Sequence, residues 1–339
     1  MINEVFKLTE PKKLEICFRE EDIEQEDYVV VKPTYMSICA ADQRYYQGKR
    51  KKEILDKKLP LTLIHEAIGK VLLDPKGEYE KSESVVLIPN TPNEEDEIVK
   101  ENYRKTSTFR SSSQDGFMQN LVFMRRDRII PIGNIKPEVA SLLELTSVSM
   151  NAIKNFSRVA HKRKEILGVW GPGSLGYITG LILKMYFSDS KIIVFGTNIE
   201  KLNCFSFVDE TLLVNNVDKN FKVDHAFECV GGRNSEIAIE QIIDCINPQG
   251  TINLLGVSEE PIHINTRMVL EKGITLLGNS RSGYEDFQKA TDFMQDEKVQ
   301  SYMENIISDV IEVDNIKDIG TAFDIDYNNN FKTIMRWNI

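Results

Sequence analysis

The stretch that decides the fold lies near the middle of the chain and reads EILGVWGPGSLGYITGLIL, residues 165–183. Its apolar run 166–170 has the length of a buried strand, and a long apolar helix is expected from Leu175 onward. Between them, Gly171, Gly173 and Gly176 follow the G-x-G-x-x-G spacing. A strand, this spacing and a helix in that order predict a dinucleotide-binding turn, whereas a Gly-rich turn in another kind of α/β domain is the alternative.

Each glycine of this turn has its own expected role. Gly171 lets the strand turn sharply, Gly173 lets the backbone approach a pyrophosphate, and Gly176 lets the helix lie close to the sheet. The helix begins around Ser174 and Leu175, and its first N–H groups face the phosphates with a partial positive charge. We therefore expect these five residues to bind the cofactor.

Length, composition and charge limit the class of protein. The chain has 339 residues, of which 41% are hydrophobic and 28% charged, so it is long enough for two ordinary globular domains. A formal net charge of -10 disfavours nucleic acid as a partner. The five cysteines include no C-x-x-C pair and suggest reduced thiols.

The N-terminal residues resemble neither a signal peptide nor a transit peptide. The longest apolar stretch, 175–187, is interrupted by Lys184 and is too short to span a bilayer. These features predict a cytoplasmic protein that does not enter a membrane.

Two patterns of predicted elements divide the chain. Residues 1–150 carry short β-branched runs between turn residues, as in a distorted barrel. Residues 151–283 alternate strands and helices, which predicts a doubly wound parallel sheet. Residues 284–339 return to the first domain. The predicted fold class is therefore α/β, with a doubly wound sheet beside a β-rich domain.

The acid that usually holds the ribose of NAD is absent. Such sites carry Asp or Glu about 20 residues past the glycines, where it binds the ribose 2′-OH. Here the second strand ends at Gly196, followed by Thr197, Asn198 and Lys201. Without the carboxylate a 2′-phosphate meets no repulsion, so we predict NADP(H), with these three residues as contacts. Alternatively, Lys201 is a solvated helix residue and the site accepts either cofactor.

Possible metal ligands lie in two segments of the β-rich part. SICAAD, residues 37–42, supplies Cys39 and Asp42, and LIHEAIG, residues 63–69, supplies His65 and Glu66. A lone Cys or His is more often structural. Together they offer the mixed sulfur, nitrogen and oxygen set of catalytic zinc, although such a set could hold another divalent ion.

The order of the motifs resembles the zinc-dependent medium-chain alcohol and polyol dehydrogenases over essentially the whole chain. The motifs are C-x-x-D at Cys39, H-E-x-x-G at His65, the turn DGFM at 115–118, the glycine motif, and ECVG at 228–231. Within that superfamily, the sequence is most similar to the ribulose-5-phosphate reductase family in the stretches SICAADQRYYQGKR, LIHEAIG, PNTP, FRSSSQDGFMQ, DHAFECVGG and LLGNSRSG.

The resemblance implies a Rossmann domain with a GroES-like barrel as the catalytic domain. It also implies that NADPH reduces D-ribulose 5-phosphate to D-ribitol 5-phosphate, which supplies CDP-ribitol for teichoic acid synthesis. By resemblance, Cys39, His65 and Glu66 bind one catalytic zinc, with Glu144 as a fourth ligand or its exchange partner. The four cysteines that hold a structural zinc in many relatives are missing from residues 90–113, so no second zinc is expected.

Several roles stay open on the sequence alone. Asp42, Tyr45 and Glu66 are alternative proton relays, and Arg44, Arg110 and Arg281 could bind the substrate phosphate or could be surface or ion-pair residues. The family context suggests a homodimer through the cofactor domain and a complex with the ribitol-5-phosphate cytidylyltransferase. Two rival functions are a polyol or alcohol dehydrogenase for an unphosphorylated substrate and a non-catalytic dinucleotide-binding protein.

Overall fold

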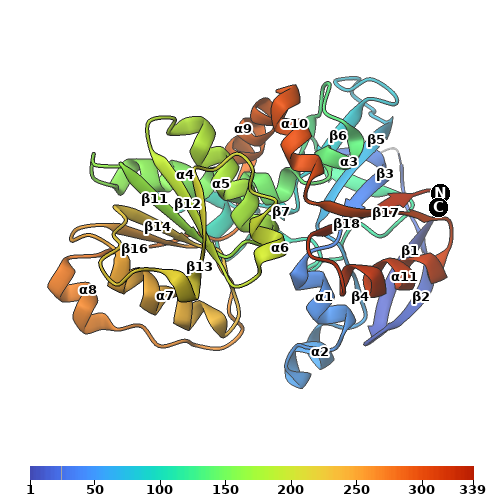
Figure 1. Ribbon diagram of the computed structural model, residues 1–339. Helices are drawn as coiled ribbons and strands as arrows, with labels where there is room; N and C mark the ends of the chain where they lie inside the picture. Colours follow the sequence, from blue (N-terminus) through green and yellow to red (C-terminus); the bar gives the residue numbers. More distant parts are fainter. Residues whose placement is uncertain (24) are drawn as a thin grey trace. The chain divides into compact units, whose positions relative to one another are not determined.

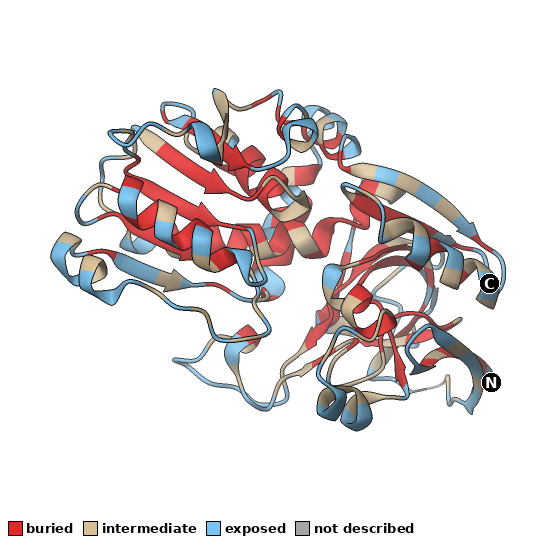
Figure 2. Ribbon diagram, turned by 60° about the horizontal axis from the view of Figure 1, so that its bottom comes forward, coloured by how far each residue is buried: buried red, intermediate tan, exposed pale blue. Residues whose placement is uncertain are grey.

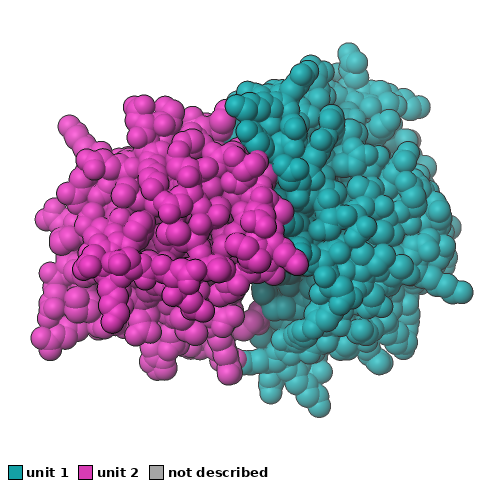
Figure 3. All heavy atoms as spheres, in the orientation of Figure 1, with its two compact units in different colours: residues 1–147, 282–339 teal, residues 148–281 magenta. Residues whose placement is uncertain are grey.

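The chain divides into two compact units in the computed structural model, which describes residues 1–23 and 25–339 (Figure 3). Unit 1 comprises Met1–Ser147 and Ser282–Ile339, and unit 2 comprises Val148–Arg281. Each unit has its own hydrophobic core. Over the two described ranges, no helix is both long enough and apolar enough to cross a membrane.

Unit 2 is built on a six-stranded parallel sheet with the strand order β13-β12-β11-β14-β15-β16 (Figure 1). Counted from β11, this is the 3-2-1-4-5-6 order of the doubly wound dinucleotide fold. The strands are β11 (Ile166–Trp170), β12 (Lys191–Gly196), β13 (Glu210–Leu213), β14 (His225–Glu228), β15 (Thr251–Leu254) and β16 (Thr275–Gly278). The helices are α4 (Leu143–Val159), which begins in unit 1, α5 (Ser174–Tyr186), α6 (Ile199–Leu202), α7 (Asn234–Cys245) and α8 (Thr266–Lys272).

The central strands of this sheet are buried on both faces (Figure 2). Strands of this kind carry continuous apolar runs rather than an alternating pattern, as β11 does. Trp170 at its end stacks on Phe195 of β12, with ring centroids 3.9 Å apart. The predicted doubly wound sheet is thereby confirmed.

Unit 1 contains a sheet of three strands, a sheet of seven and a strand pair. The small sheet has the order β2-β1-β4, and the large one β10-β6-β5-β3-β18-β17, with β9 also paired to β3. The strands are β1 (Ile2–Glu10), β2 (Lys13–Glu20), β3 (Tyr28–Ser37), β4 (Leu61–Thr62), β5 (Glu66–Leu73), β6 (Ser84–Leu87), β7 (Asn90–Thr91), β8 (Thr108–Phe109), β9 (Val122–Arg125), β10 (Ile129–Pro131), β17 (Ile307–Val313) and β18 (Lys332–Trp337).

The C-terminal segment completes the large sheet of unit 1. Strand β18 pairs with β3, where Ile334 lies opposite Ser37. Strand β5 pairs with the other side of β3, so β3 lies between β5 and β18 in the sheet. The helices of this unit are α1 (Ala40–Tyr46), α2 (Lys52–Lys58), α3 (Pro137–Ala140), α9 (Tyr284–Met294), α10 (Glu297–Glu304) and α11 (Ile316–Asp326).

His225 fixes the start of β14 through both ring nitrogens. Its Nδ1 accepts from the Thr251 N–H at 3.0 Å, and its Nε2 lies 3.1 Å from the Arg163 carbonyl, to which it donates in the neutral ring. The side chain is fully buried. Burial lowers the pKa of His225 to about 4, with His161 and Lys164 adding to the fall. The folded protein therefore keeps this ring neutral.

We expect His225 to make unit 2 less stable in acid. The unfolded chain binds a proton near pH 6.5 and the folded one only near pH 4. The neutral ring therefore contributes its full stabilisation above pH 6.5, and about 2.5 kcal/mol of it is lost when the pH falls to 4.5. His225→Asn keeps an acceptor for Thr251 and does not titrate, so its unfolding free energy should fall less between pH 7 and 4.5.

Urea unfolding in a Trp337→Phe background would measure this, because Trp170 of unit 2 is then the remaining tryptophan. Equal acid sensitivity of the two proteins would contradict the assignment of the neutral ring.

Candidate metal centre and cofactor turn

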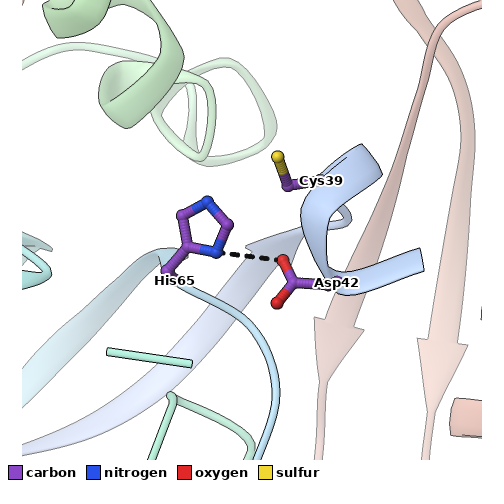
Figure 4. Close-up of side chains that lie close together, drawn as sticks. All are labelled: Cys39, Asp42 and His65. Carbon is purple, nitrogen blue, oxygen red and sulfur yellow. Dashed lines mark ion pairs between the residues drawn. The ribbon is translucent and has the colours of Figure 1, made fainter. Parts of the chain in front are cut away.

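The metal centre forms where two paired strands of unit 1 end. Cys39 follows β3 and is the N-cap of α1, and Asp42 lies in the first turn of that helix. His65 directly precedes β5, whose Glu66 is opposite Ser37 of β3. This pairing brings the two sequence-predicted segments together, and the ligand atoms of Cys39, Asp42 and His65 all lie within 4.8 Å of one another (Figure 4).

Asp42 holds His65 in one orientation. Its Oδ1 accepts from the Ile64 N–H at 3.1 Å and from Ser111 Oγ at 2.5 Å, and its Oδ2 lies 3.1 Å from His65 Nδ1. Burial alone would raise the pKa of Asp42, but His65, Ser111 and the Ile64 N–H lower it overall. A carboxylate on Nδ1 leaves Nε2 as the metal-binding atom, a common arrangement around zinc. We therefore expect Asp42 to orient His65 and not to bind the metal directly.

A buried lysine holds Glu66. Lys332 Nζ lies 2.7 Å from both carboxylate oxygens of Glu66 and donates to the Ile38 carbonyl at 3.1 Å. Both side chains are buried. Burial alone would lower the pKa of Lys332, but Glu66 and Cys39 outweigh it and raise the pKa. Glu66 and Lys332 therefore form a buried ion pair.

Sequence reasoning missed Lys332 and the role of Ser111. The only signal for the lysine is its position as the first residue of the strand KTIMRW, most of which is buried. Ser111 was part of a recognised motif, but nothing in that motif linked its hydroxyl to Asp42.

Glu144 completes the centre from the first turn of α4. One carboxylate oxygen lies within 4.8 Å of the ligand atoms of His65 and Glu66. Burial raises the pKa of Glu144 to about 7, with His65 opposing the rise and Glu66 adding to it. A cation close to Glu144 would offset this cost of ionisation.

The donor set fits zinc. A thiol, an imidazole and carboxylates converge in a buried place where acidic groups outnumber the single lysine. Zinc takes such mixed ligands, and its charge would balance the surplus of acid. Cys39, His65 and Glu144 can supply three ligands while Asp42 and Lys332 orient the groups around them. Whether Glu66 also binds directly stays a prediction.

The remaining predicted residues of unit 1 lie in different surroundings. Tyr45 is buried in the hydrophobic core, with the Arg50 guanidinium 4.5 Å from its ring centroid. Arg110 donates to the backbone carbonyls of Asp115 and Phe123, and burial lowers its pKa to about 10. Arg44 lies in the last turn of α1. The relay and phosphate-binding roles of these residues stay predictions.

The glycine turn of unit 2 has the geometry that its spacing predicts. Gly171 has a φ of 106°, and a Cβ there would come 2.8 Å from the Cys229 carbonyl carbon. Gly173 is the N-cap of α5, and a Cβ on it would meet nothing within 4 Å. A Cβ on Gly176 would collide with the Gly171 carbonyl. Ser174 and Leu175 open α5, so its first N–H groups adjoin this open space.

The end of β12 has no room for an acid. A Cβ at Gly196 would come 2.5 Å from Pro172 Cγ in the glycine turn. Asn198 is the N-cap of α6, and its side chain accepts from the Lys201 N–H at 3.0 Å. Burial lowers the pKa of Lys201, and Thr197 is exposed. Arg281, also predicted as a phosphate ligand, lies at the end of unit 2 with a φ of 58°.

A doubly wound sheet with this glycine turn, together with a Cys-His-Glu centre, defines a zinc-type medium-chain dehydrogenase. Residues 25–134 match the family described as the alcohol dehydrogenase GroES-like domain. Residues 199–296 match the family described as zinc-binding dehydrogenase. The β-rich unit is therefore GroES-like, as the resemblance implied.

Whole-chain relatives identify the family. The ribulose-5-phosphate reductase of Bacillus spizizenii is 48% identical and covers 100% of both chains. That of Streptococcus pneumoniae is 42% identical and covers 100% of this chain and 98% of the relative. The chain belongs to the ribulose-5-phosphate reductase family.

Solved structures show the same relationship. The chain superposes on the crystal structure of S. aureus TarJ in complex with NADPH with a TM-score of 0.89. The alignment covers 100% of both chains at 43% sequence identity. L-Idonate 5-dehydrogenase from Escherichia coli has a TM-score of 0.85 over 99% of this chain and 98% of its own, at 17% identity, and therefore shares the fold.

We expect Lys332→Met to destabilise unit 1 strongly. The substitution leaves Glu66 buried with no countercharge, which costs about 3–5 kcal/mol of unfolding free energy. The double variant Lys332→Met/Glu66→Gln removes both charges and should recover most of this loss. Denaturant unfolding of metal-free protein would measure it, with Lys332→Arg as the charge-preserving control. A Lys332→Met protein as stable as the wild type would show that the ion pair is not needed.

Proposed function

We propose that the protein reduces D-ribulose 5-phosphate to D-ribitol 5-phosphate with NADPH and one zinc ion, and so supplies CDP-ribitol for teichoic acid synthesis. The observation that carries this proposal is that His65 lies within 4.8 Å of ligand atoms of Cys39 and Asp42 in one group and of Glu66 and Glu144 in another, in a chain that matches ribulose-5-phosphate reductases over its full length. The absence of space for an acid at Gly196 supports NADPH over NADH.

Each group has a defined part in the proposed reaction. Zinc, when bound, acts as a Lewis acid on the substrate carbonyl, and NADPH supplies the hydride. Cys39, His65 and Glu144 hold the metal, with Asp42 orienting His65. Lys332 forms an ion pair with Glu66 beside them. The pyrophosphate is received by the glycine turn, which comprises Gly171, Gly173, Ser174, Leu175 and Gly176. The 2′-phosphate is adjoined by Thr197, Asn198 and Lys201.

The polar environment of the metal centre is prepared before the substrate arrives. Asp42 is already bonded to Ser111 and the Ile64 N–H, and Glu66 to Lys332, so neither group has to reorganise during the reaction. Such preorganisation is how an enzyme stabilises developing charge at low cost.

The purified protein should oxidise NADPH in the presence of D-ribulose 5-phosphate. We expect turnover to be much slower with NADH or with unphosphorylated D-ribulose, and to stop after zinc is removed by a chelator and return when zinc is added. The measurement is the decrease in absorbance of the reduced cofactor, with the zinc content determined on the same sample.

Three outcomes would favour other functions. Equal rates with the unphosphorylated sugar would indicate a general polyol dehydrogenase. Equal rates with NADH would remove the proposed role of the Gly196 region. Absence of both turnover and bound zinc would favour a non-catalytic dinucleotide-binding protein.

A homodimer through unit 2 is the second part of the proposal. Strand β16 is the last strand of the parallel sheet, and Thr275, Leu276 and Gly278 on it are exposed. Leu270 of the adjoining helix α8 is 80% exposed. A second copy that adds its own β16 to this edge would cover these residues.

Light scattering after size-exclusion chromatography should give the mass of a dimer for the wild type and a smaller mass for Leu276→Arg. Exposed Ile199→Arg on α6 is a matched control that should leave the mass unchanged. If the Leu276→Arg variant is still a dimer, the β16 edge is not the dimer interface. Adding the ribitol-5-phosphate cytidylyltransferase to the same column tests the predicted complex, which requires co-elution.

All five cysteines of the protein are free thiols, which supports the proposal that it works in the cytoplasm.

A further inference from the structure

One buried carboxylate outside the metal centre holds two loops together. Glu228 ends β14 and is 1% exposed. Its Oε1 accepts from the Val230 N–H at 2.8 Å, the Gly231 N–H at 3.1 Å and Ser235 Oγ at 2.9 Å. Its Oε2 accepts from the Gly256 N–H at 3.1 Å. A buried polar group is stable only when it is hydrogen-bonded, so Glu228 and its four donors hold one another in place.

The two loops follow adjacent strands of the sheet. Val230 and Gly231 belong to the turn after β14, and Gly256 belongs to the turn after β15. The fit around the carboxylate is close, because a Cβ on Gly256 would come 2.5 Å from Glu228 Oε1 and 2.6 Å from Oε2. The loops also bond directly, since the Gly232 N–H donates to the Val257 carbonyl at 2.9 Å.

The first of these loops rests on the dinucleotide turn. The Cys229 N–H donates to the Trp170 carbonyl at 2.8 Å. A Cβ on Gly171 would come 2.8 Å from the Cys229 carbonyl carbon and 2.9 Å from the Val230 nitrogen. A shift of the 229–231 backbone would therefore reach the glycine that receives the pyrophosphate.

The strand order indicates which half of the cofactor these loops face. In a 3-2-1-4-5-6 sheet each half binds one mononucleotide, and the ribose-selecting position after β12 assigns the adenosine to the half formed by β11 to β13. Strands β14 and β15 therefore belong to the nicotinamide half. Val230 and Val257 are 37% and 59% exposed on the two loops, so apolar side chains are available there for a ligand.

We propose that Glu228 is a positioning residue for the nicotinamide half of the cofactor. It acts through the backbone of Val230, Gly231 and Gly256, which it fixes at the carboxyl ends of β14 and β15. The inference rests on the proposed use of NADPH by this unit and adds a residue that does not itself touch the reacting atoms.

The variant Glu228→Gln tests this proposal with little change in volume. A glutamine has one acceptor oxygen, so its NH₂ group must face either the three donors on Oε1 or the Gly256 N–H. We expect the Kd for NADPH to rise about tenfold, the equivalent of one unmade hydrogen bond, because loops displaced from residue 228 no longer fit the nicotinamide half. Adenosine 2′,5′-bisphosphate shares only the glycine turn with these loops, so its Kd should rise by a clearly smaller factor than the Kd for NADPH.

Kinetics give a second readout that a purely structural role would not move. The KM for NADPH should rise with the Kd, whereas the KM for the sugar phosphate should stay within about twofold of the wild type. If Glu228→Gln does not fold, Ser235→Ala removes a single donor and should produce a smaller change in the same direction.

A matched control lies at the other end of the same strand. Asp224 directly precedes β14, is 3% exposed, and accepts from the Glu165 and Ile166 N–H groups and from Asn247. Asp224→Asn should lower the melting temperature while leaving the Kd for NADPH unchanged. An equal loss of NADPH affinity in this control would overturn the specific role of Glu228.

Two further results would also overturn the inference. The first is an unchanged Kd for NADPH in Glu228→Gln. The second is an equal loss of affinity for NADPH and for adenosine 2′,5′-bisphosphate in that variant. Failure of the proposed function looks different. A wild-type protein that binds NADPH without reducing D-ribulose 5-phosphate would refute the substrate, and a selective loss of NADPH affinity in Glu228→Gln would still support the inference.

Discussion

The contact between Lys332 and Glu66 joins parts of the chain that are 266 residues apart and sets the conditions for the metal centre. Two charges removed from water cost several kcal/mol each, and their attraction offsets this only in good geometry. Here one ammonium group meets both oxygens of one carboxylate at 2.7 Å. The last strand therefore contributes to the metal centre as well as to the sheet, because it carries the lysine that is the countercharge of Glu66.

The same rule applies to two other buried acids, Asp42 and Glu228. Asp42 is compensated by a serine, a backbone N–H and a histidine, and Glu228 by three backbone N–H groups and a serine. In each arrangement the carboxylate oxygens act only as hydrogen-bond acceptors. Glu144 is different, since burial raises its pKa to about 7, and it is the acid with most to gain from a cation.

Local signals in the sequence predicted a large part of this structure. The glycine spacing, the apolar run 166–170 and the alternation of strands and helices are properties of short segments, so the doubly wound sheet and its turn could be recognised. Cys39 and His65 were recognisable because they lie in short motifs. The N-terminal hairpin of β1 and β2 was not predicted, because β2 is largely exposed and lacks a clear alternating pattern.

Contacts between distant segments could not be predicted in the same way. Lys332, Ser111 and the shared donors of Glu228 acquire their roles only when the chain is folded, and no local spacing encodes them. Arg110 was named as a possible phosphate ligand because it lies in a motif segment; its guanidinium donates to two backbone carbonyls, and its role with the substrate stays a prediction. A charged residue near a motif can stabilise the fold or bind the ligand. Which role it has depends on the residues around it in the folded protein, and the sequence alone does not identify these.

The crowding between Gly196 and Pro172 has an evolutionary consequence. A Cβ at position 196 would come 2.5 Å from the proline ring of the glycine turn, so these two positions cannot change independently. Replacing Gly196 by an acid that selects NAD would also require a change at Pro172, either earlier or at the same time. A lineage that carries this proline would then tend to keep its cofactor preference, because the first step of the exchange disrupts the turn before any benefit is gained.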